Sequence, residues 1–367
     1  MCIIYMNKTL QNKILKHIEN NLNHGGKKGM VIASPSDDPP YKFHWVRDAS
    51  LVMRVFIDLY KKNETPENFY KLLNYINNSG EIQELKTLTG LGEPKINIDG
   101  SPYNEPWGRP QNDGPALRGI NMISLFKMFK KSHKKIAYNL ILPIIKIDLH
   151  YIIENVNKPC FDLWEEIIGW HLYTRVVQYK FLKEAITIKD DINLPDNLEE
   201  KMVYLREHLK HHIKDKEIIS SFDDNGNIIR NDDASVLLAF CHVNFDLEII
   251  NIFDVSRIIK TATNLEQIFK EKYSLNYSCL IGRYKDDAYY DGQAWILCSL
   301  ALAQIYFNFS QYNNYEHFYF GGSNILNTII SLNKKLDLAE QYNPVTKTFH
   351  SAETLTWNYS ELYFTTL

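Results

Sequence analysis

Apolar residues recur at positions i, i+3 and i+4 along most of this chain of 367 residues. This spacing places them on one face of an α-helix and predicts a mostly helical fold, whereas strand-like alternation is rare. We count about twelve such segments. The predicted helices span residues 7–22, 48–61, 66–79, 115–132, 136–156, 162–185, 196–214, 231–243, 253–271, 290–308, 314–334 and 354–366.

The chain shows no low-complexity linker and no sharp change of composition, so we expect one all-α domain over residues 1–367. Helices joined in sequential hairpins fit a closed double ring of inner and outer helices with a funnel at one end. An open helical solenoid is the alternative. A solenoid should repeat its sequence at a fixed period, and we find no such period.

Four of the predicted connections are long and rich in Gly, Pro, Asn, Asp and Trp. Long loops in a compact domain are usually functional, so we expect the site to be built from them. They cover residues 23–47, 86–114, 273–290 and 335–353.

Composition narrows the range of partners. The net charge is −3, with acidic and basic residues well mixed, so we expect neither a nucleic-acid partner nor an anionic membrane. Aromatic residues are plentiful, with 23 Tyr, 18 Phe and 6 Trp. Their rings suit both hydrophobic cores and sugar-binding clefts, because Tyr and Trp combine an apolar face with a polar group.

The N-terminal stretch lacks a basic region followed by a long apolar segment, so we see no signal peptide. No uninterrupted apolar run of about 18 residues predicts a transmembrane helix. The cysteines show no C-x-x-C pair and no metal-ligand spacing, so we expect no metal site, and scattered thiols favour a reducing compartment. These cysteines are Cys2, Cys160, Cys241, Cys279 and Cys298. The lack of a visible signal peptide favours an intracellular location, cytoplasmic or vacuolar.

The segment KPCFDLWEEIIGWHLYTRVVQYKFL places three carboxylates in an otherwise apolar and aromatic stretch. Asp162 and Glu165 form a D-x-x-E pair that can cap the start of a helix. This interpretation leaves unexplained a second glutamate, Glu166, close to Trp164. A carboxyl group among aromatic rings can hold a proton near neutral pH, as a general acid must.

The segment YKFHWVRD ends in Arg47 and Asp48 at a predicted helix start, and Tyr41 and Trp45 come just before them. The charged pair can be an ordinary capping and ion-pair arrangement. It can also hydrogen-bond the hydroxyl groups of a sugar, with Tyr41 stacked beneath the ring.

The loop LGEPKINIDGSPYNEPWGRPQNDGPALR holds Trp107, Arg109 and Gln111 between Gly and Pro residues that restrict the backbone. A rigid loop followed by a helix capped at Asp113 explains the Gly and Pro residues. It leaves Trp107 and Arg109 without a role, so a binding loop is the second interpretation.

Two later segments, GRYKDDAYYDGQAW and AEQYNPVTKTFHSAETLTWNYS, carry similar clusters of charged residues and aromatic rings. Taken alone, Glu340 is typical of a surface acid. The clustered residues are Arg283, Asp287, Tyr289, Trp295, Glu340, Gln341 and Trp357.

Five motifs stand in a fixed order over residues 31–367: YKFHWVRD, LGEPKIN…WGRPQNDGPALR, FDLWEE, GRYKDDAYYDGQAW and AEQY…LTWNYS. Together they resemble the catalytic domain of glycoside hydrolase family 15. The resemblance implies an (α/α)6 barrel whose helix-joining loops form the active-site funnel, without a metal or cofactor. It also implies an inverting reaction that releases β-D-glucose from the non-reducing ends of α-1,4-linked and, more slowly, α-1,6-linked glucans such as starch, glycogen and maltooligosaccharides.

Inversion needs two carboxyl groups on opposite faces of the sugar, roughly 6.5–9.5 Å apart, so that a water molecule fits. By the resemblance, Glu165 is the general acid, Glu340 is the general base, and the two meet across the funnel. Asp162 matches a nearby acid whose like charge should help to keep Glu165 protonated, against the pull of a helix N-terminus. The residues implied to bind or brace the substrate are Tyr41, Trp45, Arg47, Asp48, Trp107, Arg109, Gln111, Asp162, Trp164, Glu166, Arg283, Asp287, Tyr289, Trp295, Gln341 and Trp357.

Some features depart from the family pattern. The segment from Trp295 to Glu340 is short. After Glu166 this chain has IIGWHLYT where the family has small polar residues, and we expect Trp170 to narrow the pocket. No linker or starch-binding domain follows Leu367, so we expect a preference for short or soluble glucans. We also expect a monomer.

Other functions remain open. A glucan-sensing or regulatory module of this fold would usually lack the acid or the base, whereas Glu165 and Glu340 are both present. An inverting α-glucosidase acting on trehalose or isomalto-type sugars fits the same motifs, because linkage choice depends on contacts to the second sugar. A helical scaffold for protein partners gives no reason for paired acids in aromatic loops.

Overall fold

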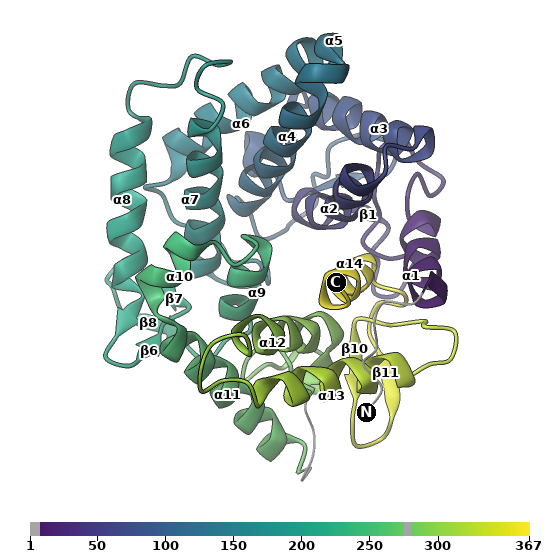
Figure 1. The fold of residues 1–367 in the computed structure, drawn as a ribbon, viewed down its shortest axis with the longest axis vertical. Coiled ribbons are helices and arrows are strands. Elements are labelled where there is room, and N and C mark those ends of the chain that lie inside the picture. Colours follow the sequence, from purple (N-terminus) through teal and green to yellow (C-terminus); the bar gives the residue numbers. More distant parts are fainter. Residues whose placement is uncertain (1–7, 275–279) are drawn as a thin grey trace. The chain divides into compact units, whose positions relative to one another are not determined.

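The computed structural model describes residues 8–274 and 280–367, and helices dominate this part of the chain (Figure 1). The chain forms two compact units. Unit 1 consists of Met1–Glu19, Ser34–Tyr41 and Lys210–Leu367, and unit 2 consists of Asn20–Ala33 and Lys42–Leu209. The single domain predicted from the sequence stays a prediction.

The helices of unit 2 gather around one central helix, α4 (Asp113–Ser132). The others are α2 (Val46–Lys62), α3 (Pro66–Gln83), α5 (Lys134–Ile136), α6 (Leu142–Asn155), α7 (Leu172–Ile186) and most of α8 (Leu198–His211), with a π-helical turn, η2 (Ala137–Ile141), between α5 and α6. Helix α4 packs on α2, α6 and α7 and is buried on nearly all sides. The contact with α7 needs a glycine: a Cβ atom on Gly119 would lie 2.2 Å from the ring of Phe181 in α7.

Unit 1 has a central helix of its own, α12 (Ile296–Phe309), whose sequence ILCSLALAQIYFNF is apolar around almost its whole circumference. The other helices are α1 (Lys8–Asn20), α9 (Ser235–His242), α10 (Leu247–Phe253), α11 (Val255–Lys272), α13 (Phe318–Ser331) and α14 (Thr356–Thr365). Helix α12 packs on α9, α11, α13 and α14. A helix without a polar face is stable only when neighbours cover it on every side, as here.

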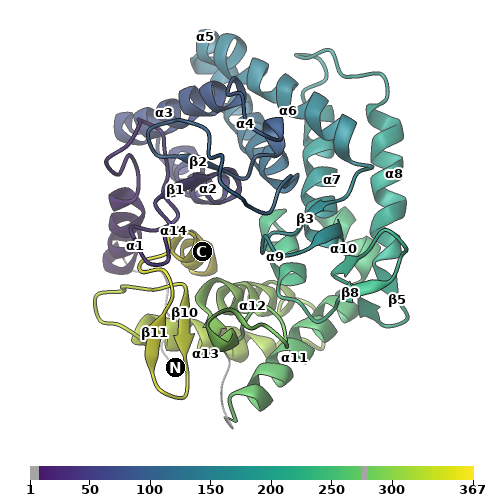
Figure 2. The same cartoon turned by 180° about the vertical axis from the view of Figure 1, so that it is seen from behind.

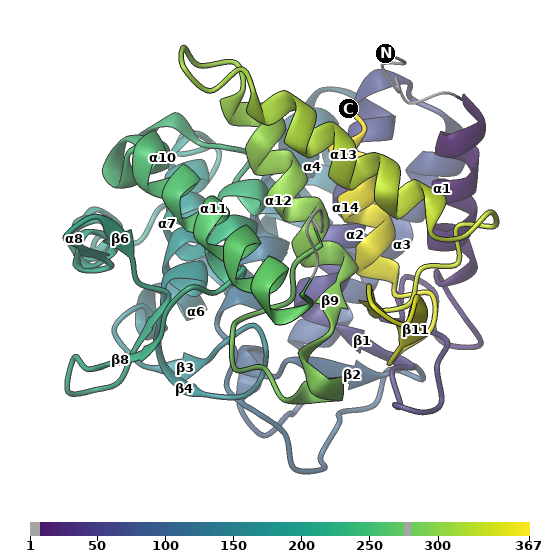
Figure 3. The same cartoon turned by 90° about the horizontal axis from the view of Figure 1, so that it is seen from below.

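Short antiparallel strand pairs lie in the loops between these helices. In unit 2, β1 (Phe43–Trp45) pairs with β2 (Lys95–Asn97), as Figure 2 shows from behind, and β3 (Cys160–Phe161) pairs with β4 (Ile168–His171). In unit 1, β10 (Gln341–Asn343) pairs with β9 (Ala294–Trp295) and with β11 (Thr348–His350), and β9 and β11 are labelled in Figure 3. The remaining short elements are β5 (Ile213–Lys214), β6 (Glu217–Ile218), β7 (Ser221–Phe222), β8 (Ile228–Arg230) and the 3-10 turns η1 (Gly90–Gly92) and η3 (Tyr289–Gly292).

Most of the predicted helices are confirmed to within a few residues, but one prediction is wrong in a way that matters for the site. The helix predicted over residues 162–185 begins only at Leu172, because the residues before it form β3, a turn and β4. The carboxylates of FDLWEE therefore lie on a turn between two strands. They do not cap a helix, so the expected pull of a helix N-terminus on Glu165 is absent.

Two smaller differences concern the start of one helix and a further helix that was not predicted. The helix predicted from residue 290 begins at Ile296, after the turn η3 and strand β9. Helix α10 was not predicted as a separate element. Among the described cysteines, Cys160, Cys241 and Cys298 are buried thiols, whereas Cys2 and Cys279 lie outside the described residues.

One described stretch, Lys134–Asn155, is long and apolar enough to cross a membrane by length and composition alone. Half of its most apolar window is buried inside the structure, and α6 packs on α3, α4 and α7 as a core helix does. The predicted absence of a membrane partner stays a prediction.

Candidate active site

Glu165 lies on the turn between β3 and β4, with a φ of +68°. A residue with a side chain seldom adopts this left-handed conformation, and such strained positions are frequent at functional sites. The buried carboxylate of Asp162 stabilises the turn: its Oδ1 accepts hydrogen bonds from the backbone N–H groups of Glu166 (2.8 Å) and Ile167 (3.0 Å). Trp164 is buried within the turn, whereas Glu166 is exposed.

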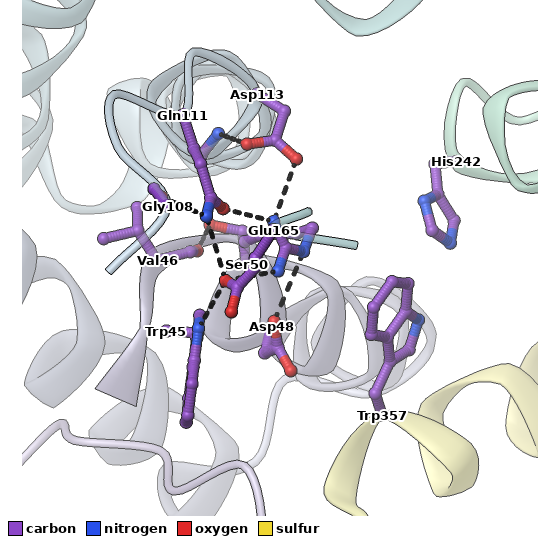
Figure 4. A network of polar contacts seen from close by, with 12 residues as sticks. Trp45, Val46, Asp48, Ser50, Gly108, Gln111, Asp113, Glu165, His242 and Trp357 are labelled. Atoms are coloured by element: carbon purple, nitrogen blue, oxygen red, sulfur yellow. Dashed lines mark hydrogen bonds and ion pairs between the residues drawn. The ribbon is translucent and has the colours of Figure 1, made fainter. Parts of the chain in front are cut away.

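Four N–H groups converge on the Glu165 carboxylate, and Figure 4 shows it with Trp45 and Gln111 beside it. Its Oε1 accepts from Trp45 Nε1 (2.7 Å), Gln111 Nε2 (3.0 Å) and Arg47 Nη2 (3.2 Å). Its Oε2 accepts from Trp107 Nε1 (2.7 Å), and the Trp107 side chain is 38% exposed. Oε1 is thus occupied by three donors, which leaves Oε2 as the oxygen that can exchange a proton with a ligand.

Arg47 connects Glu165 to the start of two helices. Its Nη1 donates to Gln111 Oε1 (2.8 Å) and to Asp113 Oδ2 (3.2 Å), and its Nε lies 3.5 Å from Asp48 Oδ2. Burial by itself lowers the pKa of Arg47. The carboxylates of Asp113, Asp48 and Glu165 raise it by more than burial lowers it, so the pKa of Arg47 is above its ordinary value. This guanidinium therefore stays charged and holds the three carboxylates in place.

At Asp48, which is also buried, burial outweighs the effect of the neighbouring charge on the pKa. Burial raises the pKa of its carboxyl group to about 7, although the nearby Arg47 lowers it. A carboxyl group that changes its charge near neutral pH can both donate to and accept from a ligand hydroxyl group.

The loop before α4 approaches the Glu165 turn closely at Gly108. A Cβ atom there would lie 2.6 Å from the carbonyl oxygen of Glu165, so only glycine fits. Arg109 was predicted to contact substrate; in the structure its Nε donates to Glu93 (2.8 Å) and its Nη1 to the carbonyl of Glu105 (3.0 Å). These bonds brace the loop that carries Trp107.

The second predicted catalytic carboxylate, Glu340, lies in unit 1 just before β10 and is buried. Its Oε2 accepts a short hydrogen bond from Ser351 Oγ. Ser351 Oγ lies 3.2 Å from the hydroxyl of Tyr289, which lies 3.3 Å from the hydroxyl of Tyr41. Burial, and then the charge of Glu340, raise the pKa of Tyr289, so the Tyr289 hydroxyl group stays protonated at neutral pH beside the carboxylate.

Arg283 and Asp287, also in unit 1, form a buried bidentate pair. Arg283 Nε donates to Asp287 Oδ2 (2.7 Å) and Nη2 donates to Oδ1 (2.6 Å). Asp287 Oδ1 also accepts from the backbone N–H of Tyr289 (2.9 Å), and the guanidinium carbon lies 4.8 Å from the centre of a Trp295 ring. The pair thus fixes both the start of η3 and the Trp295 side chain.

The last two predicted residues of unit 1, Gln341 and Trp357, are buried. Gln341 lies in β10 opposite Trp295, and neither of its side-chain amide atoms has a hydrogen-bond partner within the described ranges. Trp357 opens α14, and its Nε1 donates to Glu361 Oε1 (3.0 Å). Glu361 also accepts from Gln304 (2.9 Å) and lies 3.0 Å from His242 Nε2.

Sequence reasoning missed several residues of these networks. Asp113 was interpreted only as a helix cap, and it does accept from the backbone N–H of Gly114 (2.8 Å), but it also binds Arg47. Ser351 and Glu361 carried no signal beyond their place in the last motif. In the part of the chain that the structure describes, no group of three His, Cys, Asp or Glu residues could hold a metal ion.

Comparison with known proteins decides the family. The model of the family described as glycosyl hydrolases family 15 matches residues 7–314. The chain belongs to this family. The matched range includes Glu165 and ends before Glu340.

The family 15 chain is 32% identical to Glucoamylase-1 of Arthroderma benhamiae over 312 residues, which are 78% of this chain and 50% of that protein. It is 30% identical to a probable glucoamylase of Schizosaccharomyces pombe, over 79% of this chain and 68% of that protein. The chain thus spans about half the length of the first of these relatives.

The solved structure of a glucoamylase from Saccharomycopsis fibuligera superimposes with a TM-score of 0.86 at 24% sequence identity. The match covers 98% of this chain and 94% of that one. This likeness shows that the fold of the family 15 chain is that of the solved glucoamylase, and it confirms the predicted all-α class, the (α/α)6 barrel.

Asp48 provides a test of the site's electrostatics. Its pKa is about 7 in the folded protein against an ordinary value of 3.8, so between about pH 4 and pH 7 the folded state binds this proton more tightly than the unfolded state does. The contribution of Asp48 to stability is therefore present at low pH and is lost as the pH rises through this window. Asn has no proton to lose, so the unfolding free energy of Asp48→Asn should improve relative to wild type as the pH rises.

Urea unfolding of both proteins at the two ends of this pH window measures the change. A difference in unfolding free energy that is the same at both pH values would contradict the raised pKa of Asp48.

Proposed function

We propose that this chain is an inverting, exo-acting glucan 1,4-α-glucosidase that releases β-D-glucose from the non-reducing ends of α-1,4-linked glucans and, more slowly, from α-1,6 links. Membership of glycosyl hydrolases family 15 and the named glucoamylase relatives support the class of reaction. The observation that carries the assignment in this chain is the Glu165 carboxyl group: among the residues that the structure describes, three donors hold its Oε1 and one, Trp107, holds its Oε2.

Glu165 is the general acid of this proposal. Its Oε2 gives a proton to the glycosidic oxygen as the bond from that oxygen to C1 breaks, and the positive charge develops on the sugar ring. The carboxylate that remains is stabilised by the indole N–H groups of Trp45 and Trp107, the amide of Gln111 and the guanidinium of Arg47. These donors do not have to move during the reaction, so they favour proton release at no cost in reorganisation.

Glu340 is the general base. It takes a proton from a water molecule whose oxygen attacks C1 from the face opposite the leaving group, and this displacement yields the β-anomer. The Ser351 hydroxyl group on its Oε2 holds the carboxylate in one orientation. The row of hydroxyl groups behind it, Tyr289 and Tyr41, offers donors to the carboxylate or the sugar without adding charge.

Charged pairs in each unit suit recognition of sugar hydroxyl groups. Arg47 with Asp48 in unit 2, and Arg283 with Asp287 in unit 1, present rigid donors and acceptors of the kind that bind vicinal hydroxyl groups. We include an α-glucan or maltooligosaccharide as the substrate on this basis. The expected monomer and the expected compartment stay predictions.

The role of Glu165 is tested by Glu165→Gln. This variant should hydrolyse maltose about 10²–10⁴-fold more slowly than wild type, because an amide cannot protonate the leaving oxygen. It should retain far more of its activity on α-D-glucosyl fluoride, because fluoride leaves with little need of an acid. Glu316→Gln, at an exposed position before α13, is the matched control and should behave as wild type on both substrates. Equal losses on maltose and on the fluoride would remove Glu165 as the acid.

The role of Glu340 is tested on the same two substrates. Glu340→Gln should lower kcat by about 10²–10⁴-fold for maltose and for α-D-glucosyl fluoride alike, because both reactions need an activated water molecule. KM should change little, since the carboxylate acts on water. A variant that keeps its rate on the fluoride would show that another group activates the water.

A further inference from the structure

Lys95 in β2 is a buried lysine for which the proposed reaction has so far given no role. Its side chain is only 1% exposed, and lysine is almost never buried this fully unless it is paired. The groups around its Nζ are aromatic: it lies 3.1 Å from the centre of the Trp107 ring, 4.1 Å from Tyr103, 4.4 Å from Phe43 and 4.7 Å from Trp45. Desolvation lowers the pKa of Lys95 to about 8, against the raising effects of Glu165 and Glu93, so the ammonium group is charged at neutral pH.

Two of these four rings are the indoles that donate to Glu165. Trp45 donates to Oε1 and Trp107 donates to Oε2, each over 2.7 Å. The two side chains come from different parts of the chain, one from β1 and one from the loop after β2, and their rings meet edge to face at 6.2 Å. Lys95 lies directly across the strand pair from Trp45, so β1 and β2 place the ammonium group beside both rings.

The Trp107 ring needs a contact such as that with the Lys95 ammonium group to hold it in position. Its side chain is more than a third exposed and comes from a loop, so one part of the ring has no protein around it. A desolvated ammonium group attracts the face of an indole, and it does so without competing for the indole N–H. The N–H of Trp107 therefore remains available for Oε2 of Glu165 while the ring is held from its face.

We propose that Lys95 is a positioning residue for the general acid: its ammonium group fixes the indoles of Trp45 and Trp107 so that both N–H groups point at the Glu165 carboxylate. This inference rests on the proposed function, in which Glu165 is the acid. Among the described residues no hydrogen bond joins Lys95 to Glu165, so the ammonium group reaches the reacting carboxyl through the two tryptophans and through its charge.

The test compares Lys95→Met and Lys95→Arg with wild type on maltose and on α-D-glucosyl fluoride. Met keeps most of the volume and removes the charge, so kcat for maltose should fall by about 10- to 100-fold with KM nearly unchanged. Turnover of the fluoride should fall much less, because that reaction needs little acid. Arg keeps a cation that stacks on indole rings and should restore most of the maltose rate.

A purely structural lysine gives a different pattern. Equal losses on the two substrates, a fall confined to KM, or an Arg variant no better than Met would each overturn the positioning role. Circular dichroism and thermal unfolding confirm that the variants fold. If Lys95→Met does not fold, the folded Lys95→Arg protein decides the question. A retained maltose rate supports the positioning role, whereas a loss of the maltose rate alone contradicts it, because Arg also places a cation against the indoles.

A second readout does not depend on activity. Titration of the wild-type tryptophan fluorescence should show a step near pH 8, where Lys95 loses its charge, and Lys95→Met should lack it. The charged groups that also act on Lys95 are Glu165, Glu93 and Arg109, and none of them is changed in that variant. A wild type that turns over neither substrate would contradict the proposed function, whereas an absent fluorescence step in an active wild type would contradict the contact of Lys95 with the indoles.

Discussion

The four N–H groups around the Glu165 carboxylate are the constraint on which the arrangement of unit 2 depends. They come from β1, from the first turn of α2 and from the loop before α4, so these three segments must lie at a fixed distance from one turn. Several otherwise unrelated features serve this requirement. Glu165 itself has a left-handed backbone, Gly108 lets the loop approach the carbonyl of Glu165, and Asp162 holds the turn through two backbone N–H groups.

Both units solve the same physical problem, which is how to hold carboxyl groups in one orientation in a buried position. Burying an isolated ion costs several kcal/mol, so each carboxylate needs partners whose own charges or hydrogen bonds are also satisfied. In unit 2, Arg47 supplies this for Asp48, Asp113 and Glu165 together. In unit 1, Arg283 serves Asp287, and Ser351 serves Glu340. The apolar surroundings of α4 and α12 supply the hydrophobic stabilisation that offsets these costs.

The sequence predicted helix limits well where the apolar periodicity extends over several turns and where residues typical of turns cluster at the ends. Helices such as α2, α4 and α11 carry sustained apolar faces or clear ends, and their limits could be predicted to within a few residues. The segment around Glu165 could not, because FDLWEEIIGWH has the aromatic and acidic spacing of a capped amphipathic helix. What decides its conformation is the tertiary bond network of Glu165, whose partners are distant in sequence, together with the pairing of β3 with β4.

The residues named for the site were found through sequence motifs. The structure adds their bonds, their burial and their neighbours, which a motif does not specify. Arg109 could be named from its loop, but its bonds to Glu93 and to loop carbonyls depend on the folded path of that loop. The raised pKa of Asp48 follows from burial, which no residue pattern reports. Lys95 stands in the middle of a motif as an ordinary basic residue, and only the convergence of four rings on its Nζ gives it a role.

The central claim is that two carboxyl groups, Glu165 as acid and Glu340 as base, act by a single displacement. Proton NMR of the purified protein turning over maltotriose, with the anomeric region followed from the first minutes, tests it most directly. The account predicts that β-glucose appears first and that the α-anomer follows only by mutarotation. If α-glucose appears first, the reaction retains configuration, and the assignment of Glu340 as the base is contradicted.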